Sequence, residues 1–555
     1  MAYQSSFPPI PIPETDLWSL IFRRDPKNVP FPETKEIFTS AKTGVSYSLA
    51  TVRQSAHEFG CGLKARWSWR KGEVLTLYTP NSIDTAATTM GTLWAGGIIS
   101  PANPLYTVEE LTRQLVDSGS KGLVTQLAHL PIAREAASRA NLPESRIILL
   151  GEGRDNTGRV AHWSQMRSAK YTYVFSRTAI EPKKDLAFLV YSSGTTGLPK
   201  GVCLTHHNMV SNVLQFAFME GRTFHPSGGH DGKGDRQLGV LPLFHIYGLM
   251  CGILGSLYLG LEIVLLERFE MEEALRTIEK YRCTFAYVPP PIILAFGKHP
   301  AVDGYDLSSL KMLHSGAAPL TRELTEAVWK RLGVPVKQGF GLSESGSVTH
   351  VQSWDEWGKF MGSVGKLVPN MEARIVDEEG EVVKDGEAGE LWLKGPNIFV
   401  GYYKQPEKTG EALTSDGWFK TGDVFRRDKY GNYFCVDRLK ELIKYKGFPV
   451  PPAELEGLLI GHEEVVDVCV IGVEDKDQAT EVPRAYIVLK SGVEPSDGKA
   501  REMADWLANQ VAPHKKLRGG VRFVDQVPKS PSGKILRRLM REQAKKEDRV
   551  SGPKL

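Results

Sequence analysis

The feature that most constrains the fold is the alternation of short apolar runs with helical patterns between residues 70 and 340. Short apolar runs of this kind are typical of buried parallel strands, and the segments between them of crossover helices. The sequence therefore predicts an α/β fold whose binding loops gather at the carboxyl ends of the strands. The predicted strands are Val74–Tyr78, Gly122–Thr125, Arg146–Leu150, Leu186–Tyr191, Leu261–Leu266, Thr284–Val288 and Met312–His314.

The pattern changes twice in the last third of the chain. Between residues 365 and 436 it becomes short strands and turns, which predicts a small antiparallel β subdomain, and a smaller α/β unit follows Asp437. A chain of 555 residues also exceeds what one hydrophobic core usually serves. We therefore expect a large N-terminal domain of parallel α/β subdomains with the antiparallel subdomain, residues 1–439, and a smaller mobile α/β C-terminal domain, residues 440–555.

Composition excludes several classes of function. A net charge of +4 and the lack of a basic block argue against a nucleic-acid partner. The six cysteines lie far apart, which argues against zinc or redox pairs and favours a reduced compartment. The most apolar stretch, Leu249–Leu266, contains Glu262 and three glycines, so we expect a buried helix followed by a strand and no membrane span.

A loop rich in glycine and hydroxyl groups follows the predicted strand Leu186–Tyr191 and runs from Ser192 to Val202. Glycine lets backbone N–H groups approach phosphate oxygens, and the hydroxyls and Lys200 add donors and charge. It is not a Walker loop, because Gly201 follows the lysine where that motif needs Ser or Thr. Taken alone, such a stretch is more often a plain surface loop. The candidate phosphate-binding residues are Ser192, Ser193, Gly194, Thr195, Thr196, Gly197 and Lys200.

Four further motifs follow this loop in a fixed order. They are Gln338–Ser345, Thr421–Gly422–Asp423, Val436–Lys444 and Pro531–Ser532–Gly533–Lys534. Together the five motifs resemble the adenylate-forming superfamily of acyl/aryl-CoA synthetases and luciferases, and Val436–Gly447 looks most like 4-coumarate:CoA ligases and beetle luciferases. The resemblance covers nearly the whole chain.

The resemblance implies an acid–thiol ligase that uses ATP, Mg²⁺ and coenzyme A. A carboxylic acid would be adenylated with release of pyrophosphate, and the acyl group would then pass to coenzyme A with release of AMP. Two alternatives stay open: a luciferase-like oxygenase, and an acyl-adenylating enzyme that serves a separate carrier protein. The acid is not identified, since cinnamate-like, phenylacetate-like and medium-chain fatty acids would all suit an apolar pocket.

The resemblance also implies how the nucleotide is held. Glu344 would bind Mg²⁺, a hard cation that takes oxygen ligands. Asp423 would accept hydrogen bonds from the ribose hydroxyls, with Arg438 beside it. The adenylate would contact Gln338, Gly339, Phe340, Gly341 and Ser343, where the family more often has Thr in place of Ser343.

The same resemblance implies that the small domain uses two different faces, one for adenylation and one for thioester formation. Lys534 would neutralise charge on the α-phosphate and the acyl oxygen during adenylation. The domain would then rotate about a hinge at Lys440 and present Lys444, Lys446 and Gly447 for thioester formation. Plant coumarate ligases usually have Gln where this chain has Pro449, which is a departure within that second face.

The acyl pocket is expected around His245, which would gate the acyl and thiol tunnels, and Tyr247, which would line the pocket with Ser315, Gly316 and Ala317. Amino-acid-activating relatives place an Asp directly after the phenylalanine that matches Phe244. Here His245 takes that position, so we expect a substrate without an α-amine, because an unpaired buried ammonium is costly.

The chain ends in Pro553-Lys554-Leu555, whereas peroxisomal address signals end in Ser-Lys-Leu. We expect a peroxisomal location through an import receptor, and otherwise a cytoplasmic one, since the amino terminus lacks the plan of a secretory signal.

Overall fold

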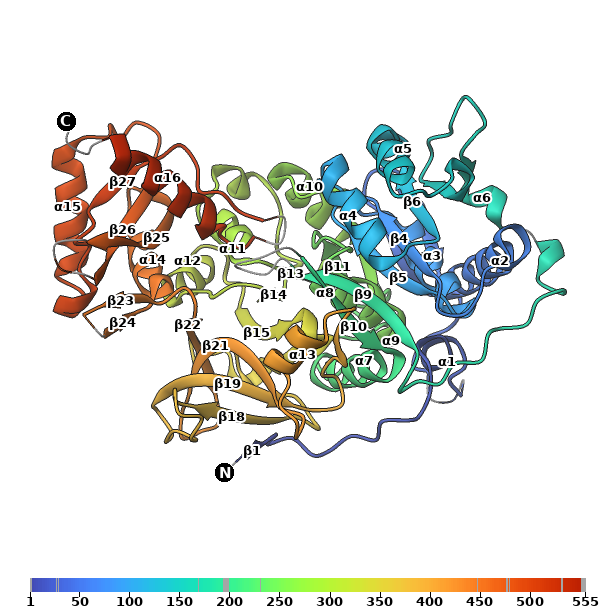
Figure 1. Cartoon of the computed structure of the whole chain (residues 1–555), viewed down its shortest axis with the longest axis horizontal. Coiled ribbons are helices and arrows are strands. Elements are labelled where there is room, and N and C mark those ends of the chain that lie inside the picture. Colours follow the sequence, from blue (N-terminus) through green and yellow to red (C-terminus); the bar gives the residue numbers. More distant parts are fainter. Residues whose placement is uncertain are drawn as a thin grey trace.

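The computed structural model describes residues 2–25, 27, 29–167, 169–192, 199–229, 231–446, 448–475, 478, 480–530 and 533–550, with the backbone alone for 549 and 550. Of the predicted site residues, Ser193, Gly194, Thr195, Thr196, Gly197 and Gly447 lie outside the described residues, as do Pro553, Lys554 and Leu555. The molecule is elongated, with the C-terminal unit at one end and the N-terminal helices at the other (Figure 1).

The first sheet confirms the predicted parallel α/β architecture. Its strand order within the described residues is β20-β10-β9-β5-β4-β6-β7-β8. The pairs from β9 to β8 are parallel, and β10 runs antiparallel to β9. The strands are β4 (Val74–Tyr78), β5 (Ile98–Ala102), β6 (Gly122–Gln126), β7 (Ile147–Leu150), β8 (Ala161–His162), β9 (Leu186–Ser192), β10 (Lys200–Thr205) and β20 (Gly401–Tyr402).

The predicted loop Ser192–Val202 is shorter in the structure, because Lys200 already opens strand β10 and pairs with Ser192 of β9. Val202 and Leu204 are apolar and fully buried, so the residues after Lys200 form a strand of their own rather than the end of a loop. The segment between β9 and β10 is therefore the connection of an antiparallel pair at one side of the parallel sheet.

The second sheet has the order β17-β16-β15-β14-β13-β11-β12-β2-β3 and carries parallel strands at its centre. Short buried strands and amphipathic helices such as α10 (Met271–Tyr281) bury a shared core between them. The strands are β2 (Glu36–Ser40), β3 (Ser46–Ser48), β11 (Arg236–Gly239), β12 (Glu262–Leu265), β13 (Phe285–Val288), β14 (Met312–Ser315), β15 (Val336–Leu342), β16 (Ser347–Val351) and β17 (Lys366–Leu367).

The helices of the large region flank these two sheets. Their bounds are α1 (Leu17–Phe22), α2 (Leu49–Trp67), α3 (Asp84–Trp94), α4 (Val108–Ser118), α5 (Leu130–Arg139), α6 (Trp163–Met166), α7 (His206–Glu220), α8 (Ile246–Gly248), α9 (Gly255–Leu259), α11 (Pro290–Lys298), α12 (Arg322–Leu332) and α13 (Pro406–Ala412).

The apolar stretch Leu249–Leu266 is a buried helix followed by a strand, as predicted. It forms a π-helix over Leu249–Leu254, continues as α9 and ends in β12. Among the described residues, no helix has both the length and the apolar character that crossing a bilayer requires. π-Helical turns are rare and occur frequently at functional sites, and this one begins two residues after Tyr247.

The antiparallel subdomain is confirmed, with one strand that the sequence pattern did not predict. The order is β1-β18-β19-β21-β22, and the extra strand β1 (Tyr3–Gln4) comes from the amino-terminal segment. The other strands are β18 (Glu372–Val376), β19 (Ala388–Lys394), β21 (Phe419–Arg427) and β22 (Tyr433–Arg438).

The C-terminal unit is a small α/β structure beside the second sheet (Figure 1). Along the chain a helix that packs on β25 lies between the hairpin β23-β24 and the sheet β25-β26-β27, and β23 also contacts β26. The elements are β23 (Ile443–Tyr445), β24 (Phe448–Val450), α14 (Pro452–Ile460), β25 (Val465–Asp475), β26 (Thr480–Leu489), α15 (Asp497–Ala508), β27 (Val521–Phe523) and α16 (Arg537–Val550). The domain boundary at residue 440 stays a prediction.

Candidate active site

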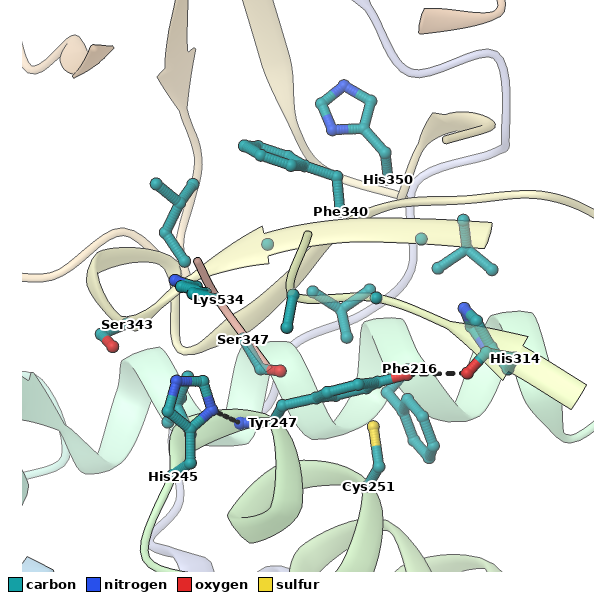
Figure 2. A pocket seen from close by; sticks show the side chains of 18 residues that line it. Phe216, His245, Tyr247, Cys251, His314, Phe340, Ser343, Ser347, His350 and Lys534 are labelled. Atoms are coloured by element: carbon teal, nitrogen blue, oxygen red, sulfur yellow. Dashed lines mark hydrogen bonds between the residues drawn. The ribbon is translucent and has the colours of Figure 1, made fainter. Parts of the chain in front are cut away.

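A cavity lies where the strands β14, β15 and β16 face the residues that follow β11 (Figure 2). Its empty volume is about 570 Å³ with the open mouth included. Lys534, His245 and Ser343 lie at one end, His314, Phe216 and Cys251 lie at the other, and the ring of Tyr247 extends between them (Figure 2). Predicted residues that line it are His245, Tyr247, Gly316, Ala317, Gly339, Phe340, Gly341, Ser343 and Lys534.

Lys534 reaches this cavity from the C-terminal unit on a tight turn. The carbonyl of Lys534 accepts from the Ser530 N–H at 2.8 Å, and its own N–H donates to Ser530 Oγ at 3.1 Å. Gly533 has a φ of +83°, and a Cβ there would lie 2.9 Å from Pro289 Cβ. Glycine is therefore required both for the left-handed turn and for the close approach to the large region.

Charges of both signs surround the Lys534 ammonium. Burial and the nearby Arg438 lower the pKa of Lys534 to about 8, while Asp423 and Glu344 act in the opposite direction. Burial raises the pKa of Asp423 to about 6, against the effect of Arg438, whose Nε lies 3.4 Å from Asp423 Oδ1. Three of the sequence motifs thus meet around one cation, although they are far apart in the chain.

Glu344 lies half-buried at the edge of this group. Its Oε1 accepts a hydrogen bond from Tyr402 Oη at 3.0 Å, and Lys200 Nζ lies 4.7 Å from the centre of the Tyr402 ring. A carboxylate oxygen is the kind of ligand that Mg²⁺ prefers, so Glu344 fits that ion. Tyr402 was not predicted, because it lies on a short strand outside every motif.

His245 and Tyr247 line the same side of the cavity. His245 Nδ1 accepts from the Tyr247 N–H at 3.3 Å, and burial, helped by Lys534, lowers the pKa of His245 to about 3. The imidazole is therefore neutral at physiological pH. Tyr247 Oη donates to the carbonyl of His314 at 3.1 Å, and burial raises the pKa of its phenol well above the usual value.

The inner end of the cavity rests on a buried ion pair that sequence analysis missed. Lys337 Nζ lies 2.7 Å from Glu220 Oε1, and both side chains are almost completely buried. His314 Nδ1 lies 3.6 Å from the same oxygen, and burial followed by Lys337 lowers the pKa of His314 well below its usual range. Cys251 and Phe216 also line the cavity and were not predicted. The sequence could have indicated Cys251, because it follows Tyr247 by one helical turn. No sequence pattern indicates Phe216.

Backbone geometry fixes the floor of the cavity. Ala317 has a φ of +72°, which is strained for a residue with a Cβ and common at binding sites. A Cβ on Gly341 would lie 1.4 Å from the carbonyl oxygen of Ser347, so glycine is required there. Of the remaining predicted residues, Ser315 and Gln338 are buried in strands below the cavity, and Ser192 lies at the end of β9.

The structure does not bring Lys440, Lys444 or Lys446 to the cavity. All three are exposed, in the segment that leads through hairpin β23-β24. The backbone N–H groups of Lys444 and Lys446 donate to Glu481 and Thr480 of β26, at 2.9 and 2.7 Å. Their side chains are thus available to solvent in this conformation.

Comparison with known proteins identifies relatives along the whole chain. Residues 27–403 match the family model described as AMP-binding enzyme, and residues 454–534 match the AMP-binding enzyme C-terminal domain. A probable 4-coumarate–CoA ligase 1 from Dictyostelium discoideum is 37% identical over 553 residues, covering 97% of both chains. The peroxisomal OPC-8:0-CoA ligase 1 of Arabidopsis thaliana is 40% identical over 474 residues, covering 84% of this chain and 83% of that one.

A solved structure has the same fold. The anthranilate CoA ligase AuaEII in complex with anthranoyl-AMP superposes with a TM-score of 0.84 at 25% identity, covering 97% of this chain and 99% of that one.

Proposed function

Because this chain belongs to the AMP-binding enzyme family and is an acyl/aryl-CoA ligase, we propose that Lys534 carries its adenylation step and that a second face of the C-terminal unit carries thioester formation. The observation that carries the proposal is the position of Lys534. It lines one end of the cavity, in the electrostatic field of Asp423, Glu344 and Arg438.

The chemistry of the first step explains this arrangement. A carboxylate is a poor electrophile, because its oxide is a poor leaving group, and adenylation converts that oxide into AMP. The attack on the α-phosphate needs alignment and charge neutralisation more than covalent help. The Lys534 ammonium would bind the α-phosphate and the acyl oxygen together, which holds the two reacting groups in contact.

The nucleotide would extend from this point in two directions. The segment that begins at Ser192 and ends at Lys200 would bind the β- and γ-phosphates, and Asp423 would accept from the ribose hydroxyls. Glu344 would hold Mg²⁺, which neutralises phosphate charge when it is bound. The pair of Asp423 with Arg438 supports this role, since the arginine favours the ionised carboxylate despite burial.

The acid would lie along Tyr247 towards His314. Among the described residues that line the cavity there is no carboxylate, and the nearby Glu220 is already paired with Lys337. A substrate ammonium would therefore stay unpaired, which supports an acid without an α-amine. His245, neutral and at the boundary with Lys534, would gate the passage between acid and thiol.

The second step requires the C-terminal unit to move. We place the hinge at Lys440, and Lys444, Lys446 and Gly447 would then face the acyl-adenylate and coenzyme A. The exposure of Lys444 and Lys446 in the present conformation agrees with a face that is not yet engaged.

ATP–pyrophosphate exchange over a panel of aromatic and medium-chain acids tests this function. We expect exchange with at least one acid, and an acyl-CoA product by mass spectrometry when coenzyme A is added. Transfer to a holo-carrier protein alone, or oxygen uptake with the acyl-adenylate, would replace the ligase by one of its alternatives.

We also propose a peroxisomal location, on the basis of Pro553-Lys554-Leu555 and the named location of the Arabidopsis relative. A fluorescent protein that carries these last residues should enter peroxisomes. Loss of import when Leu555 is removed is the expected control, and a cytoplasmic signal from the intact tail would refute the proposal.

A further inference from the structure

Helix α14 of the C-terminal unit has no N-terminal cap of its own. Pro451 stands at the cap position and makes no side-chain hydrogen bond to the helix. The Ala453 N–H instead donates to Asp437 Oδ2 at 2.9 Å, and Asp437 belongs to β22, before the proposed hinge. A buried carboxylate at this end also complements the positive end of the helix dipole.

The other end of α14 is held by a cation of the large region. Lys298, the last residue of α11, donates from Nζ to the carbonyls of Ile460 at 3.0 Å and Val465 at 3.1 Å. The final carbonyls of a helix lack partners within the helix and carry partial negative charge. Lys298 therefore satisfies groups that would otherwise face water or remain unpaired.

Close packing joins the middle of α14 to the large region. A Cβ on Gly457 would lie 2.5 Å from Thr321 Cγ2, so no side chain fits there without movement. Thr321 opens α12, where its Oγ1 accepts from the Leu324 N–H at 3.4 Å. The two helices α12 and α14 lie side by side between the two parts of the molecule (Figure 1).

The helix is also tied to the turn that carries Lys534. Arg537, three residues further on, donates to Glu456 of α14 at 2.5 Å and to Glu441 at 2.6 Å. These side chains all follow residue 440, so they would move as one body. What holds α14 on the large region therefore also holds Lys534 in the cavity.

We infer that Asp437, Lys298 and the Thr321–Gly457 contact form a latch on α14, which holds the molecule in its adenylating conformation and opens before thioester formation. The inference rests on the proposed function. Each latch contact joins a residue before Lys440 to one after it, so rotation about that hinge breaks all of them. Asp437 and Lys298 are thus positioning residues that set the balance between the two half-reactions.

The test measures the half-reactions separately in Lys298→Met, Asp437→Asn and Gly457→Ala. ATP–pyrophosphate exchange reports adenylation, and acyl-CoA formed from supplied acyl-adenylate reports thioester formation. We expect adenylation to fall about tenfold in each variant. Lys298→Met and Asp437→Asn lose a hydrogen bond made by a charged group, and Gly457→Ala places its Cβ against Thr321 Cγ2. Thioester formation should stay unchanged or rise, because the latch no longer opposes rotation.

Two matched controls separate the latch from general damage. Lys515 pairs with Glu454 of the same helix at 2.6 Å but lies within the C-terminal unit, so Lys515→Met should leave both half-reactions unchanged. Adding Thr321→Ser to Gly457→Ala removes the clashing Cγ2 and keeps the hydroxyl that caps α12. This double variant should regain adenylation.

Limited trypsin cleavage after Lys440 supplies a readout that does not depend on activity. Gly457→Ala should be cut faster than the wild type, and the double variant should be cut at the wild-type rate. Equal losses in both half-reactions, or unchanged cleavage and unchanged kinetics, would overturn the latch. A wild type that forms no adenylate from any acid would overturn the proposed function instead, whatever the cleavage pattern.

Discussion

The C-terminal unit carries two sets of lysines that meet different surroundings. Lys534 lies half-buried in the cavity, where burial and Arg438 lower its pKa to about 8. Lys444 is exposed on β23, and Lys446 is exposed directly after that strand, before β24. One small unit thus offers one engaged and one unengaged face. The difference indicates that a single conformation can serve only one of the two proposed steps. Mutations in one face should therefore impair one step and spare the other.

Replacing Lys534 should give the largest separation. Lys534→Ala removes the one side chain proposed to neutralise both the α-phosphate and the acyl oxygen, so adenylation should fall about 100- to 1000-fold. Thioester formation from supplied acyl-adenylate should change less than about threefold, because that step would use the other face. ATP–pyrophosphate exchange and acyl-CoA release measure the two steps.

Lys529→Ala is the matched control for this variant. Lys529 precedes the same turn but pairs with Asp467 at 2.7 Å, so its loss should spare both half-reactions. Equal losses in the two steps for Lys534→Ala would contradict the assigned role and the comparison of the two faces.

The complementary change is the double variant Lys444→Ala with Lys446→Ala. We expect thioester formation to fall about tenfold to fiftyfold, as expected for lost charge-assisted contacts, and adenylation to stay within twofold of the wild type. The measurement is the rate of acyl-CoA formation at saturating acyl-adenylate. A loss confined to adenylation would mean that the exposed hairpin acts in the first step.

The fold is predictable from the sequence where a segment carries its own pattern. The apolar runs Val74–Tyr78 and Met312–His314 match β4 and β14, because a buried parallel strand is apolar at nearly every position. Strand β1 was missed, since Tyr3 and Gln4 become a strand only through pairing with β18. A two-residue edge strand has too little pattern to be recognised.

Site residues could be proposed from the sequence where they belong to a recognisable motif. Lys534, Asp423 and Glu344 were found by resemblance, although the spacing of these residues in the chain gives no reason for them to meet. The pair Glu220–Lys337 was not found, because each residue alone is an ordinary charged residue in a helix or strand. The two residues pair only because the fold buries them against each other, although they are 117 positions apart in the chain, and no local sequence pattern indicates such a contact.

The rate of adenylation and the rate of thioester formation should also depend differently on pH. Lys534 acts as a cation, so adenylation should fall as pH rises through about 8, by about five- to tenfold between pH 7 and pH 9. Asp423 accepts as a carboxylate, so adenylation should also fall as pH drops below about 6. Acyl-CoA formation from supplied adenylate should lack the alkaline loss. A flat profile for adenylation between pH 7 and pH 9 would contradict the role of the Lys534 ammonium.

The smallest expected effect concerns Pro449, which pairs with Lys444 across the hairpin β23-β24. Proline has no backbone N–H and fixes its φ, so it stiffens β24, the strand that pairs with the one carrying Lys444. Pro449→Gln restores the residue usual in plant coumarate ligases and adds both a backbone donor and a side-chain amide. We expect a two- to threefold change in the KM for coenzyme A and no change in adenylation, since one exposed hydrogen bond is worth little. A larger effect on ATP–pyrophosphate exchange than on the KM for coenzyme A would show that the hairpin is coupled to the first step, and the two faces would then not be independent.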